Sequence, residues 1–278
     1  MKKLIINFAP TGMVPTKEMT PYVPISTQEI VDNVVQCEKM GVSMVHLHAR
    51  DTDGLPTYKK EVYSDIILGI REKCPDIVIT VSTSGRNYSE FDKRSEVLTI
   101  EGDAKPDMAS LTLSSLNFAY TVSVNSPQTI IALARMMKER GIKAELEVFD
   151  LGMVNFAKYL INKGLVTPPF YFNIILGNVA SAQATLLHAG LIIADLPSNS
   201  YYSLTGIGIN QKLMNALAVV SADGVRVGLE DNIWADECLQ RFATNQSNVE
   251  FVTGLAKVLE RPIATSCDVR MMLQLDGK

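Results

Sequence analysis

This chain is poor in histidine, cysteine and tryptophan, and it has no long apolar run. Its 278 residues include three histidines, four cysteines and one tryptophan. The cysteines lie far apart and form no CxxC pair, so they are expected to be reduced thiols of a cytoplasmic protein. The opening MKKLIINFAPTG has too short an apolar stretch for a secretory signal. No segment approaches the roughly 18 apolar residues that a membrane-spanning helix requires, so no membrane partner is expected.

Neither sign of charge dominates the chain. Lysine and arginine number 26 against 30 aspartates and glutamates, which gives a net charge of −4. This balance provides no general attraction to nucleic acid or to an acidic membrane, so neither is an expected partner. The apolar content of 47% and the charged content of 20% are those of an ordinary globular protein. An anionic ligand would need a local group of positive residues.

Eight short runs of β-branched and apolar residues recur along the whole chain. They lie at 4–9, 44–49, 77–82, 108–113, 145–149, 170–176, 201–207 and 225–230. Most of the intervening segments are long enough to return as a helix, and this alternation predicts a parallel sheet. Eight units predict an α/β protein with a (β/α)8, or TIM-barrel, fold: a single domain over 1–278 with extra C-terminal helices. An open doubly wound sheet is the alternative, but no GxGxxG motif follows the first run, which argues against a dinucleotide fold.

Amphipathic segments and glycines mark the expected helices. Helical patterns cover 27–40, 127–140, 153–163, 209–221, 246–260 and 263–274. Ser26 or Thr27 is a candidate N-cap for the first of them. Gly41, Gly141, Gly164 and Gly224 are each expected to end a helix just before a strand. The proline-bearing segment 9–24 is a long first loop, which in a barrel lies over the C-terminal face, where active sites form.

Two of the three histidines, His46 and His48, lie two positions apart at the end of the second run. Residues two apart on a strand point to the same face, so both imidazoles are placed to bind one Zn²⁺. The alternative is a hydrogen-bonded histidine pair that structures a polar end of the barrel. The third histidine, His188, lies in a leucine-rich helical stretch and is expected to be structural.

A metal site needs at least one more ligand, and Glu230 at the end of the eighth run is the best candidate. Strands two and eight both flank strand one in a closed barrel, so Glu230 is expected to converge on the histidine pair. Three such ligands leave coordination positions open for water or substrate, as in catalytic zinc sites.

Other polar residues accompany these candidates. Glu145 and Glu147 lie on one face of the fifth run, and Arg226 in the eighth is a credible partner for a carboxylate inside the barrel. For Glu145, a structural ion pair and a catalytic role remain open, whereas the position of Glu147 near the strand end favours function. Asp231 is either the N-cap of a helix at 232–240 or a general base held by Arg226.

Three reaction classes use a barrel with such polar strand ends. Amidohydrolases carry His-x-His but need further histidines, and a Schiff-base aldolase needs a lysine at a strand end, which strands four to eight lack. A metal-assisted carbon–carbon bond enzyme needs a Lewis acid and a carboxylate base, and the residues above supply both.

The chain resembles the β-keto acid cleavage enzymes, the family of the 3-keto-5-aminohexanoate cleavage enzyme. The resemblance runs nearly end to end and rests on APTG at 9–12, HLHARDTDGLPT at 46–57, STSG at 82–85, LTLSSLNF at 111–118, ELEVFDLGM at 145–153 and VRVGLEDNIW at 225–234. It implies a TIM barrel that binds Zn²⁺, assembles as a homotetramer and converts a β-keto acid and acetyl-CoA into acetoacetate and a new acyl-CoA.

The resemblance also implies roles for individual residues. It assigns metal binding to His46, His48 and Glu230, and it assigns catalysis or substrate contact to Ser82, Ser110, Glu147, Arg226 and Asp231. Thr83 and Gly85, in the same loop as Ser82, are also expected to bind the substrate. In the implied Claisen and retro-Claisen sequence, Asp231 removes a proton from the substrate methylene while Arg226 and Glu147 position it. Ser82 binds the substrate carboxylate or an oxyanion.

One departure concerns the substrate. Where the amino-keto-acid enzyme has an acidic residue in the first loop, this chain has Val14, which cannot pair with an ammonium group. Val14 is therefore expected to contact a neutral or apolar tail. Two other readings stay open: a metal-dependent aldolase or lyase that uses no CoA, and a non-catalytic barrel that binds a keto acid or an acyl-CoA.

Overall fold

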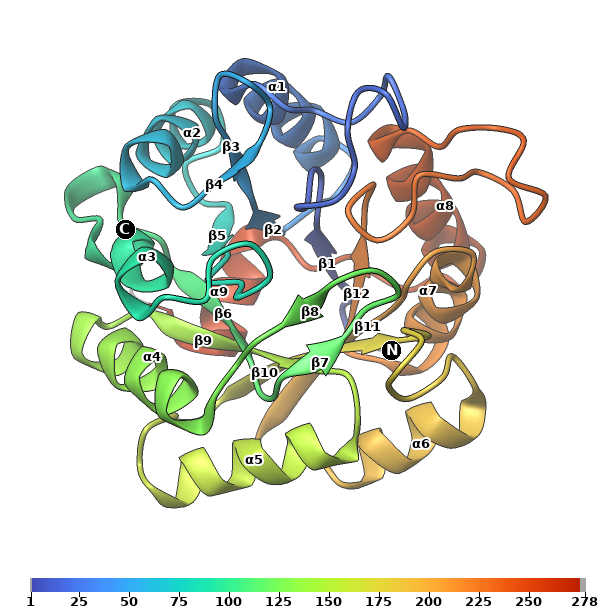
Figure 1. The fold of residues 1–278 in the computed structure, drawn as a ribbon. Helices are drawn as coiled ribbons and strands as arrows, with labels where there is room; N and C mark the ends of the chain where they lie inside the picture. Colours follow the sequence, from blue (N-terminus) through green and yellow to red (C-terminus); the bar gives the residue numbers. More distant parts are fainter. Residues whose placement is uncertain (1, 276–278) are drawn as a thin grey trace.

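In the computed structural model, which describes residues 2–275, eight parallel strands close into a barrel (Figure 1). The strands are β1 (Ile5–Phe8), β2 (Met44–Leu47), β5 (Val78–Val81), β6 (Met108–Thr112), β9 (Lys143–Val148), β10 (Phe170–Leu176), β11 (Ser200–Gly206) and β12 (Gly224–Val227). All eight predicted strands are present, and β1 pairs with both β2 and β12 as predicted. The open doubly wound sheet is thus excluded, because the ring of strands is complete.

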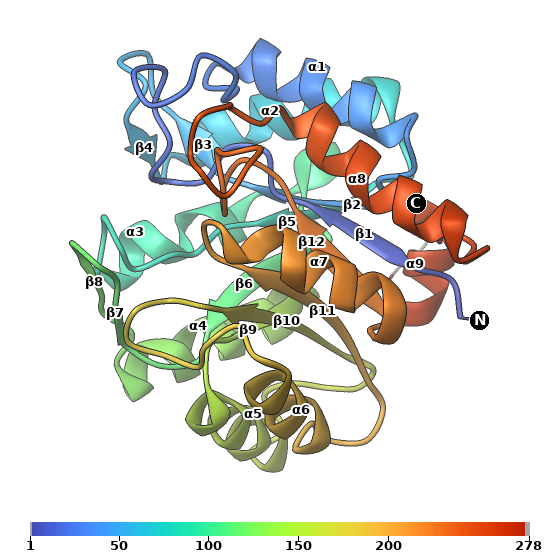
Figure 2. The same cartoon turned by 90° about the vertical axis from the view of Figure 1, so that its right-hand side faces the viewer.

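Helices surround this barrel, and short hairpins extend its C-terminal end (Figures 1 and 2). The helices are α1 (Thr27–Glu38), α2 (Lys60–Lys73), α3 (Phe91–Ser95), α4 (Pro127–Arg140), α5 (Leu151–Asn162), α6 (Leu186–Ala194), α7 (Asn210–Ser221), α8 (Asn245–Val258) and α9 (Ser266–Leu273). The hairpins are β3 (Ala49–Arg50) with β4 (Pro56–Thr57), and β7 (Leu116–Asn117) with β8 (Val122–Ser123); two 3-10 turns are η1 (Glu96–Thr99) and η2 (Gly102–Ala104). The six predicted helices are all present, and Ser26 is the N-cap of α1. No helix in residues 2–275 is long and apolar enough to cross a membrane.

Three of the four glycines expected to end helices do so. Gly41, Gly141 and Gly164 follow α1, α4 and α5 with positive φ angles of 109°, 61° and 65°, which glycine adopts without steric cost. The prediction for Gly224 is wrong, because this residue is the first of β12. A Cβ there would collide with the Ser203 side chain and lie 2.9 Å from Cβ of Ile5, so the close approach of three strands requires glycine.

Strand residues alternate between two environments. Side chains such as Ile6, Val45 and Phe172 face outward and pack in the apolar layer beneath the helices. Those of opposite parity face the barrel interior, and they change character along the strands: an apolar layer at the N-terminal end, then a polar layer. The polar layer contains Asn7, His46, Thr80, Ser110, Glu145, Asn173, Ser203 and Arg226, all of them buried.

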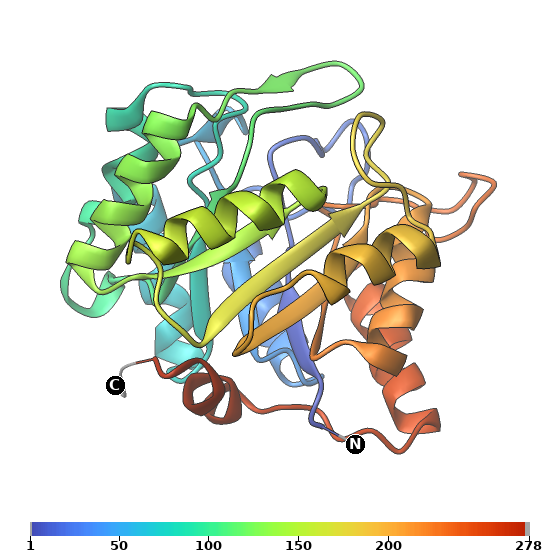
Figure 3. The same ribbon diagram turned by 90° about the horizontal axis from the view of Figure 1, so that it is seen from below.

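Helix α9 closes the N-terminal end of the barrel (Figures 2 and 3). Its Val269 and Leu273 pack against Ile5, Met44, Val78, Met108 and Tyr171, which form the apolar interior layer. Capping by Thr265 and Asp268 begins the helix. Since this end is filled, ligands can reach the barrel interior from the opposite end, where the loops that follow the strands lie.

Candidate metal and catalytic site

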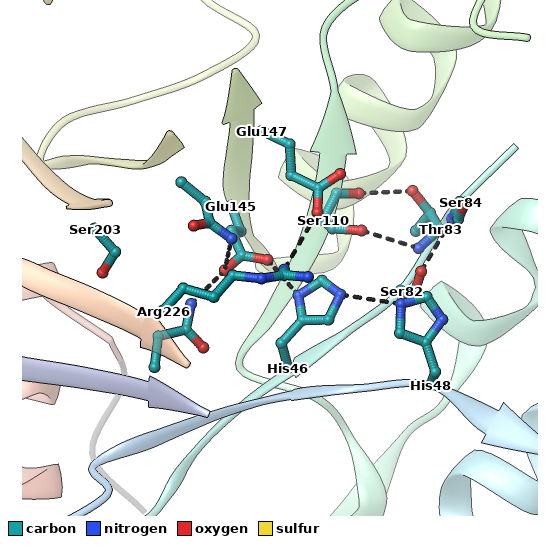
Figure 4. A network of polar contacts seen from close by, with 12 residues as sticks. His46, His48, Ser82, Thr83, Ser84, Ser110, Glu145, Glu147, Ser203 and Arg226 are labelled. Carbon is teal, nitrogen blue, oxygen red and sulfur yellow. Dashed lines mark hydrogen bonds and ion pairs between the residues drawn. The ribbon is translucent and has the colours of Figure 1, made fainter. Parts of the chain in front are cut away.

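His46 and His48 converge at the C-terminal end of β2, within the polar interior (Figure 4). Their Nε2 atoms lie 3.3 Å apart, and their ring centroids lie 5.2 Å apart. Both side chains are almost fully buried. The pair therefore shares one face of the strand, as the spacing predicted, although β2 itself ends at Leu47 and β3 begins at Ala49.

A carboxylate orients His46. Oε2 of Glu145, on β9 across the barrel, lies 2.6 Å from Nδ1 of His46, and Oε1 accepts a 2.7 Å hydrogen bond from Nδ2 of Asn7. Glu145 favours the proton of His46 on Nδ1, and in the neutral imidazole this leaves the lone pair on Nε2, the atom that faces His48. The role of Glu145 as a partner of His46 was missed by sequence analysis, which offered Arg226 as the partner for a carboxylate inside the barrel. Arg226 instead donates hydrogen bonds to Glu230 and Asp231 and lies 3.7 Å from Glu147.

Glu230 reaches the histidine pair from a turn rather than from the end of a strand. The prediction that Glu230 ends the eighth strand is wrong, because β12 ends at Val227 and Gly228 has a φ of 151°. A Cβ at Gly228 would clash with the Ala9 backbone, so glycine lets the chain turn there. Oε1 of Glu230 lies 3.2 Å from Nε2 of His48 and accepts a 2.7 Å hydrogen bond from Nη2 of Arg226.

The residues present fit a divalent metal ion. Ligand atoms of His46, His48 and Glu230 all lie within 4.8 Å of one another. Oε2 of Glu230 is buried without a hydrogen-bond partner among the described residues, which is the state of an atom that a cation would satisfy. Two imidazoles and a carboxylate form a typical donor set for catalytic zinc. The convergence that the sequence predicted is therefore present, while the role of these residues as ligands stays a prediction.

The charge balance of the site also favours a cation. The buried Arg226 pairs with Glu147, Glu230 and Asp231, and Glu145 pairs with His46, so carboxylates outnumber this arginine. Burial lowers the pKa of His46, but Glu145 and Glu230 outweigh it and raise that pKa to about 9. The carboxylates thus favour a positive charge at this imidazole, and a metal ion supplies such charge without a proton.

Arg226 holds Asp231 in a two-point contact. Nε of Arg226 donates to Oδ2 of Asp231 at 2.8 Å, and Nη2 donates to Oδ1 at 3.1 Å. Burial raises the pKa of Asp231 above its ordinary value even though Arg226 lowers it, so this carboxylate has the increased basicity of a general base. Asp231 does not cap a helix, because residues 232–240 form turns and irregular backbone. The other predicted arrangement, a carboxylate held by Arg226, is the one present.

Glu147 completes this group at the end of β9. Its Oε2 accepts a 2.6 Å hydrogen bond from Oγ1 of Thr112, and its Oε1 lies 3.7 Å from Nη1 of Arg226. Burial raises the pKa of Glu147, against the effect of His46 and Arg226. Glu147 thus lies beside Arg226, while its role in positioning Asp231 through Arg226 stays a prediction.

The loop after β5 lies beside the histidines. Oγ of Ser82 accepts a 3.2 Å hydrogen bond from the Ser84 backbone N–H. Thr83 binds Ser110 twice: its Oγ1 donates to the Ser110 carbonyl at 2.6 Å, and its backbone N–H donates to the Ser110 hydroxyl at 3.2 Å. A small cavity joins Ser82 and Thr83 to His48 and to Met13 of the first loop.

Two of the residues predicted to bind the substrate, Gly85 and Val14, do not line the cavity beside His48. Gly85 is buried, and a Cβ there would lie 2.6 Å from the Val124 carbonyl oxygen and 2.8 Å from Nη1 of Arg94, so the position requires glycine for packing. Val14 is 49% exposed, and its neighbour Met13, not Val14, lines the cavity beside His48. The contact of Val14 with a substrate tail stays a prediction.

Two buried arginines fix the loops around the site. Nη2 of Arg50 donates to the carbonyls of Gly12 and Pro15 at 2.6 and 3.0 Å, which ties the first loop to β3. Arg94 of α3 donates to the Thr83 carbonyl at 2.8 Å and to the side chain of Asn125 at 2.7 Å. Sequence analysis missed Arg94, because nothing in the sequence of a short charged segment indicates that one of its arginines is buried.

His188 lies outside this site, as predicted. It belongs to the first turn of α6, and its Nδ1 accepts a 2.7 Å hydrogen bond from the Gln183 backbone. The contact fixes the loop that precedes the helix, which is a structural role.

Comparison with known proteins agrees with the fold and the sequence motifs. The family described as beta-keto acid cleavage enzyme matches residues 3–275. A 3-keto-5-aminohexanoate cleavage enzyme of Fusobacterium nucleatum is 38% identical over 277 residues, 99% of each chain, and a 3-oxoadipate:acetyl-CoA acetyltransferase of Cupriavidus necator is 32% identical over 283 residues. The apo structure of ObcA superimposes with a TM-score of 0.82 at 21% identity, covering 92% of this chain and 66% of that one, which speaks for the fold alone. The chain belongs to the beta-keto acid cleavage enzyme family.

Proposed function

We propose that this protein is a zinc-dependent acyltransferase that converts a β-keto acid and acetyl-CoA into acetoacetate and a new acyl-CoA. The observation that carries the proposal is the Arg226–Asp231 pair beside the group of His46, His48 and Glu230. Family membership supports it, as do the names of relatives that act on β-keto acids with acetyl-CoA.

His46, His48 and Glu230 would hold the metal, and Glu145 would keep the His46 imidazole in the binding tautomer. Zinc, when bound, supplies a Lewis acid that polarises the keto group and makes the methylene beside it more acidic. Ser82, beside His48 in the cavity, would donate a hydrogen bond to the substrate carboxylate or to an oxyanion, and Thr83, Gly85 and Ser110 would keep the loop in place.

The reaction divides into two carbon–carbon steps. Asp231 takes a proton from C2 of the β-keto acid, and C2 attacks the acetyl carbonyl, which forms a bond and releases CoA as a thiolate. The thiolate then attacks C3 of the original keto acid, the C2–C3 bond breaks, and Asp231 returns its proton to the departing acetoacetate. Arg226 stays bound to Asp231 throughout, and Glu147 limits its movement from the other side. A buried carboxylate of raised pKa suits both the uptake and the return of the proton.

Two other functions differ from this one in what they require. A metal-dependent aldolase or lyase would need no CoA, and a binding barrel would need no base. The two hydrogen bonds from Arg226 favour catalysis, because they hold Asp231 in a buried position that a mere binding site does not need.

The test is to purify the protein, measure its metal content and assay acetoacetate formation from six-carbon β-keto acids with and without acetyl-CoA. We expect about one zinc ion per chain in the wild type, little in His46→Ala, and turnover only with acetyl-CoA. Turnover without acetyl-CoA would establish the aldolase, and bound metal with no turnover of any substrate would favour the binding barrel.

The assembly would be a homotetramer, and the reaction would take place in the cytoplasm. Leu186, Leu187 and Leu191 of α6 are 73%, 68% and 47% exposed, and exposed leucines grouped on one helix are typical of a subunit contact. The four cysteines are free thiols, which suits a reducing compartment. Light scattering on the eluted protein measures the assembly, and a monomer in solution would contradict this expectation.

A further inference from the structure

Arg86 follows the STSG segment, and its guanidinium lies over an aromatic ring. The central carbon of the guanidinium is 3.6 Å from the centroid of the Phe118 ring. Phe118 lies next to β7, in the hairpin that extends over the barrel mouth (Figure 1), and packs edge-on against Phe149 with centroids 6.0 Å apart. Phe149 therefore helps to hold the Phe118 ring in place, and this ring covers one face of the Arg86 guanidinium.

The backbone around Arg86 is fixed as well. The Ser84 hydroxyl accepts a 3.3 Å hydrogen bond from the Arg86 backbone N–H, while the Ser82 hydroxyl accepts one from Ser84. Gly85 lies against Arg94, with too little space for a side chain at this position. The half-buried Arg86 side chain thus begins from an anchored loop rather than from a loose one.

The guanidinium edge of Arg86 differs from those of the neighbouring arginines. Arg50 directs its N–H groups to backbone carbonyls, Arg94 directs its own to backbone carbonyls and to the Asn125 side chain, and Arg226 directs its own to carboxylates. Within the part of the chain that the structure describes, the Arg86 side chain has no hydrogen bond and no ion pair, only its contact with Phe118. Five N–H donors in one plane therefore remain available to a ligand.

Arg86 also lies within electrostatic range of the carboxylates of the site. Burial lowers its pKa, whereas the carboxylates of Glu230, Glu147 and Asp231 raise it, so these groups interact across the mouth of the barrel. None of them forms an ion pair with Arg86. A substrate whose keto group lies at the histidines would extend its tail between these carboxylates and Arg86. An anionic tail would be repelled by the acids and would need a cation there.

We propose that Arg86 is a specificity-determining residue that binds a carboxylate at the far end of the β-keto acid, so that the preferred substrates are dicarboxylic. The inference rests on the proposed function and deepens it. The contact with Phe118 uses none of the N–H donors of Arg86, and the planar N–H fork matches a carboxylate with two parallel hydrogen bonds. It replaces the neutral or apolar tail that the sequence predicted from Val14 alone, since that prediction did not consider Arg86.

Two other anions fit this position less well. The CoA phosphates are separated from the thiol by the long pantetheine arm, so they cannot lie next to Asp231 while the thioester reacts there. The carboxylate that all β-keto acids share lies two carbons from the keto carbon, in reach of Ser82 beside His48. The carboxylate of a longer tail is the one that remains for Arg86.

The experiment compares three six-carbon β-keto acids that differ only at the tail. They are 3-oxohexanedioate, 3-oxohexanoate and 3-oxo-5-aminohexanoate, each assayed with acetyl-CoA for kcat and KM and titrated into the zinc-loaded protein for Kd. The variants are Arg86→Gln, Arg86→Lys and Phe118→Leu, with Arg135→Gln on the exposed side of α4 as the matched control. Circular dichroism confirms that each variant is folded.

We expect wild type to prefer the dicarboxylate over the neutral acid by about 10- to 100-fold in kcat/KM, mainly through KM, because a charge-assisted contact has this effect. Arg86→Gln should abolish the preference, mainly through a higher KM for the dicarboxylate. Arg86→Lys should retain part of it, Phe118→Leu should weaken it, and Arg135→Gln should leave it intact.

Three results would overturn the proposal. The first is a wild-type protein that prefers the neutral acid. The second is an Arg86→Gln variant that loses activity equally on all three substrates, because Arg86 would then bind the carboxylate that all three share or balance the charge of the site. The third is equal Kd for the dicarboxylate and the neutral acid. Failure of the proposed function is a separate result, namely no acetoacetate from any of the three, and the titrations still test Arg86 in that case.

Discussion

The two ends of the barrel interior differ sharply within two residues of each strand. At the N-terminal end, Ile5, Met44 and Val78 meet α9 in a closed apolar layer. Two positions further along the same strands stand Asn7, His46 and Thr80, which are polar and equally buried. Because residues i and i+2 share one face of a strand, the two layers have the same backbone support and differ only in side-chain chemistry. One end can therefore supply stability while the other carries charge.

The polar end of the barrel interior lowers the stability of the fold in a way that the apolar end does not, because some of its buried polar atoms have no hydrogen-bond partner among the described residues. Six of the ten buried polar side-chain atoms that have no hydrogen-bond partner in the described chain belong to the barrel strands or to the turn after β12, namely atoms of Asn7, Thr80, Asn173, Thr205, Arg226 and Glu230. Each such atom lowers stability, and such atoms persist where a ligand satisfies them or where function requires them. A substitution at the polar end should thus affect mainly activity, and a substitution at the apolar end should affect mainly stability.

The largest expected effect is on activity at the polar end. Asp231→Asn keeps the size of the side chain and removes the proton acceptor, so kcat should fall by about 10²- to 10⁴-fold. Because the change also removes one of several crowded carboxylates, the Tm should stay equal or rise. Steady-state assays and thermal unfolding of the metal-loaded protein measure both.

A matched control for this variant is Asp53→Asn, which changes an exposed aspartate in the turn between β3 and β4. It should leave kcat and Tm unchanged. An Asp231→Asn protein with bound zinc and the turnover of wild type would refute the assignment of the base.

The next effect is on metal binding. Glu145→Gln preserves an oxygen near Nδ1 of His46 but removes the charge that favours the binding tautomer, so zinc affinity should fall by about 10- to 100-fold. Competition with a zinc chelator gives the affinity, and activity should return when zinc is in excess. Glu250→Gln, on the exposed side of α8, is the control. Unchanged affinity in Glu145→Gln would show that the contact with His46 is structural only.

The sequence alone was sufficient to predict those features of the site that follow from the periodicity of strands. The spacing of His46 and His48 places them on one face, and counting eight strands makes the second and eighth strands neighbours of the first. These inferences need only the period of a strand and the closure of a barrel.

The parts that the sequence could not provide depend on contacts across the barrel. Whether Glu145 meets His46 or Arg226 depends on the stagger between β2, β9 and β12, which no local pattern records. The turn at Gly228 depends on the approach of the Ala9 backbone, and the burial of Arg94 depends on two loops that fold over it. In each case the deciding partner is distant in the sequence.

A substitution at the apolar end should lower stability and leave activity unchanged. Leu273 of α9 is fully buried among the interior apolar residues. Leu273→Ala should lower the free energy of unfolding by about 2–5 kcal/mol, because it leaves a cavity where the barrel is closed. Denaturant titration measures the loss, and kcat at a temperature well below the Tm should equal that of wild type. A large loss of kcat in a folded Leu273→Ala protein would mean that the two ends are coupled.

The smallest expected effect concerns the acid stability of the closed end. Asp268 caps α9 and binds Nζ of Lys3 at 2.7 Å, and the hydrogen bonds from Lys3 and Thr265 lower its pKa from 3.8 to about 2. A carboxylate whose pKa is lower in the folded state than in the unfolded state stabilises the fold above the unfolded pKa, and it loses that effect as the pH falls through the folded pKa. Asp268→Asn should therefore lower the Tm slightly at neutral pH, and its difference from wild type should shrink between pH 4 and pH 2, where the native carboxylate becomes protonated. Thermal unfolding across this range measures the difference. A constant difference down to pH 2 would mean that the effect of the substitution does not depend on the charge of the Asp268 carboxylate.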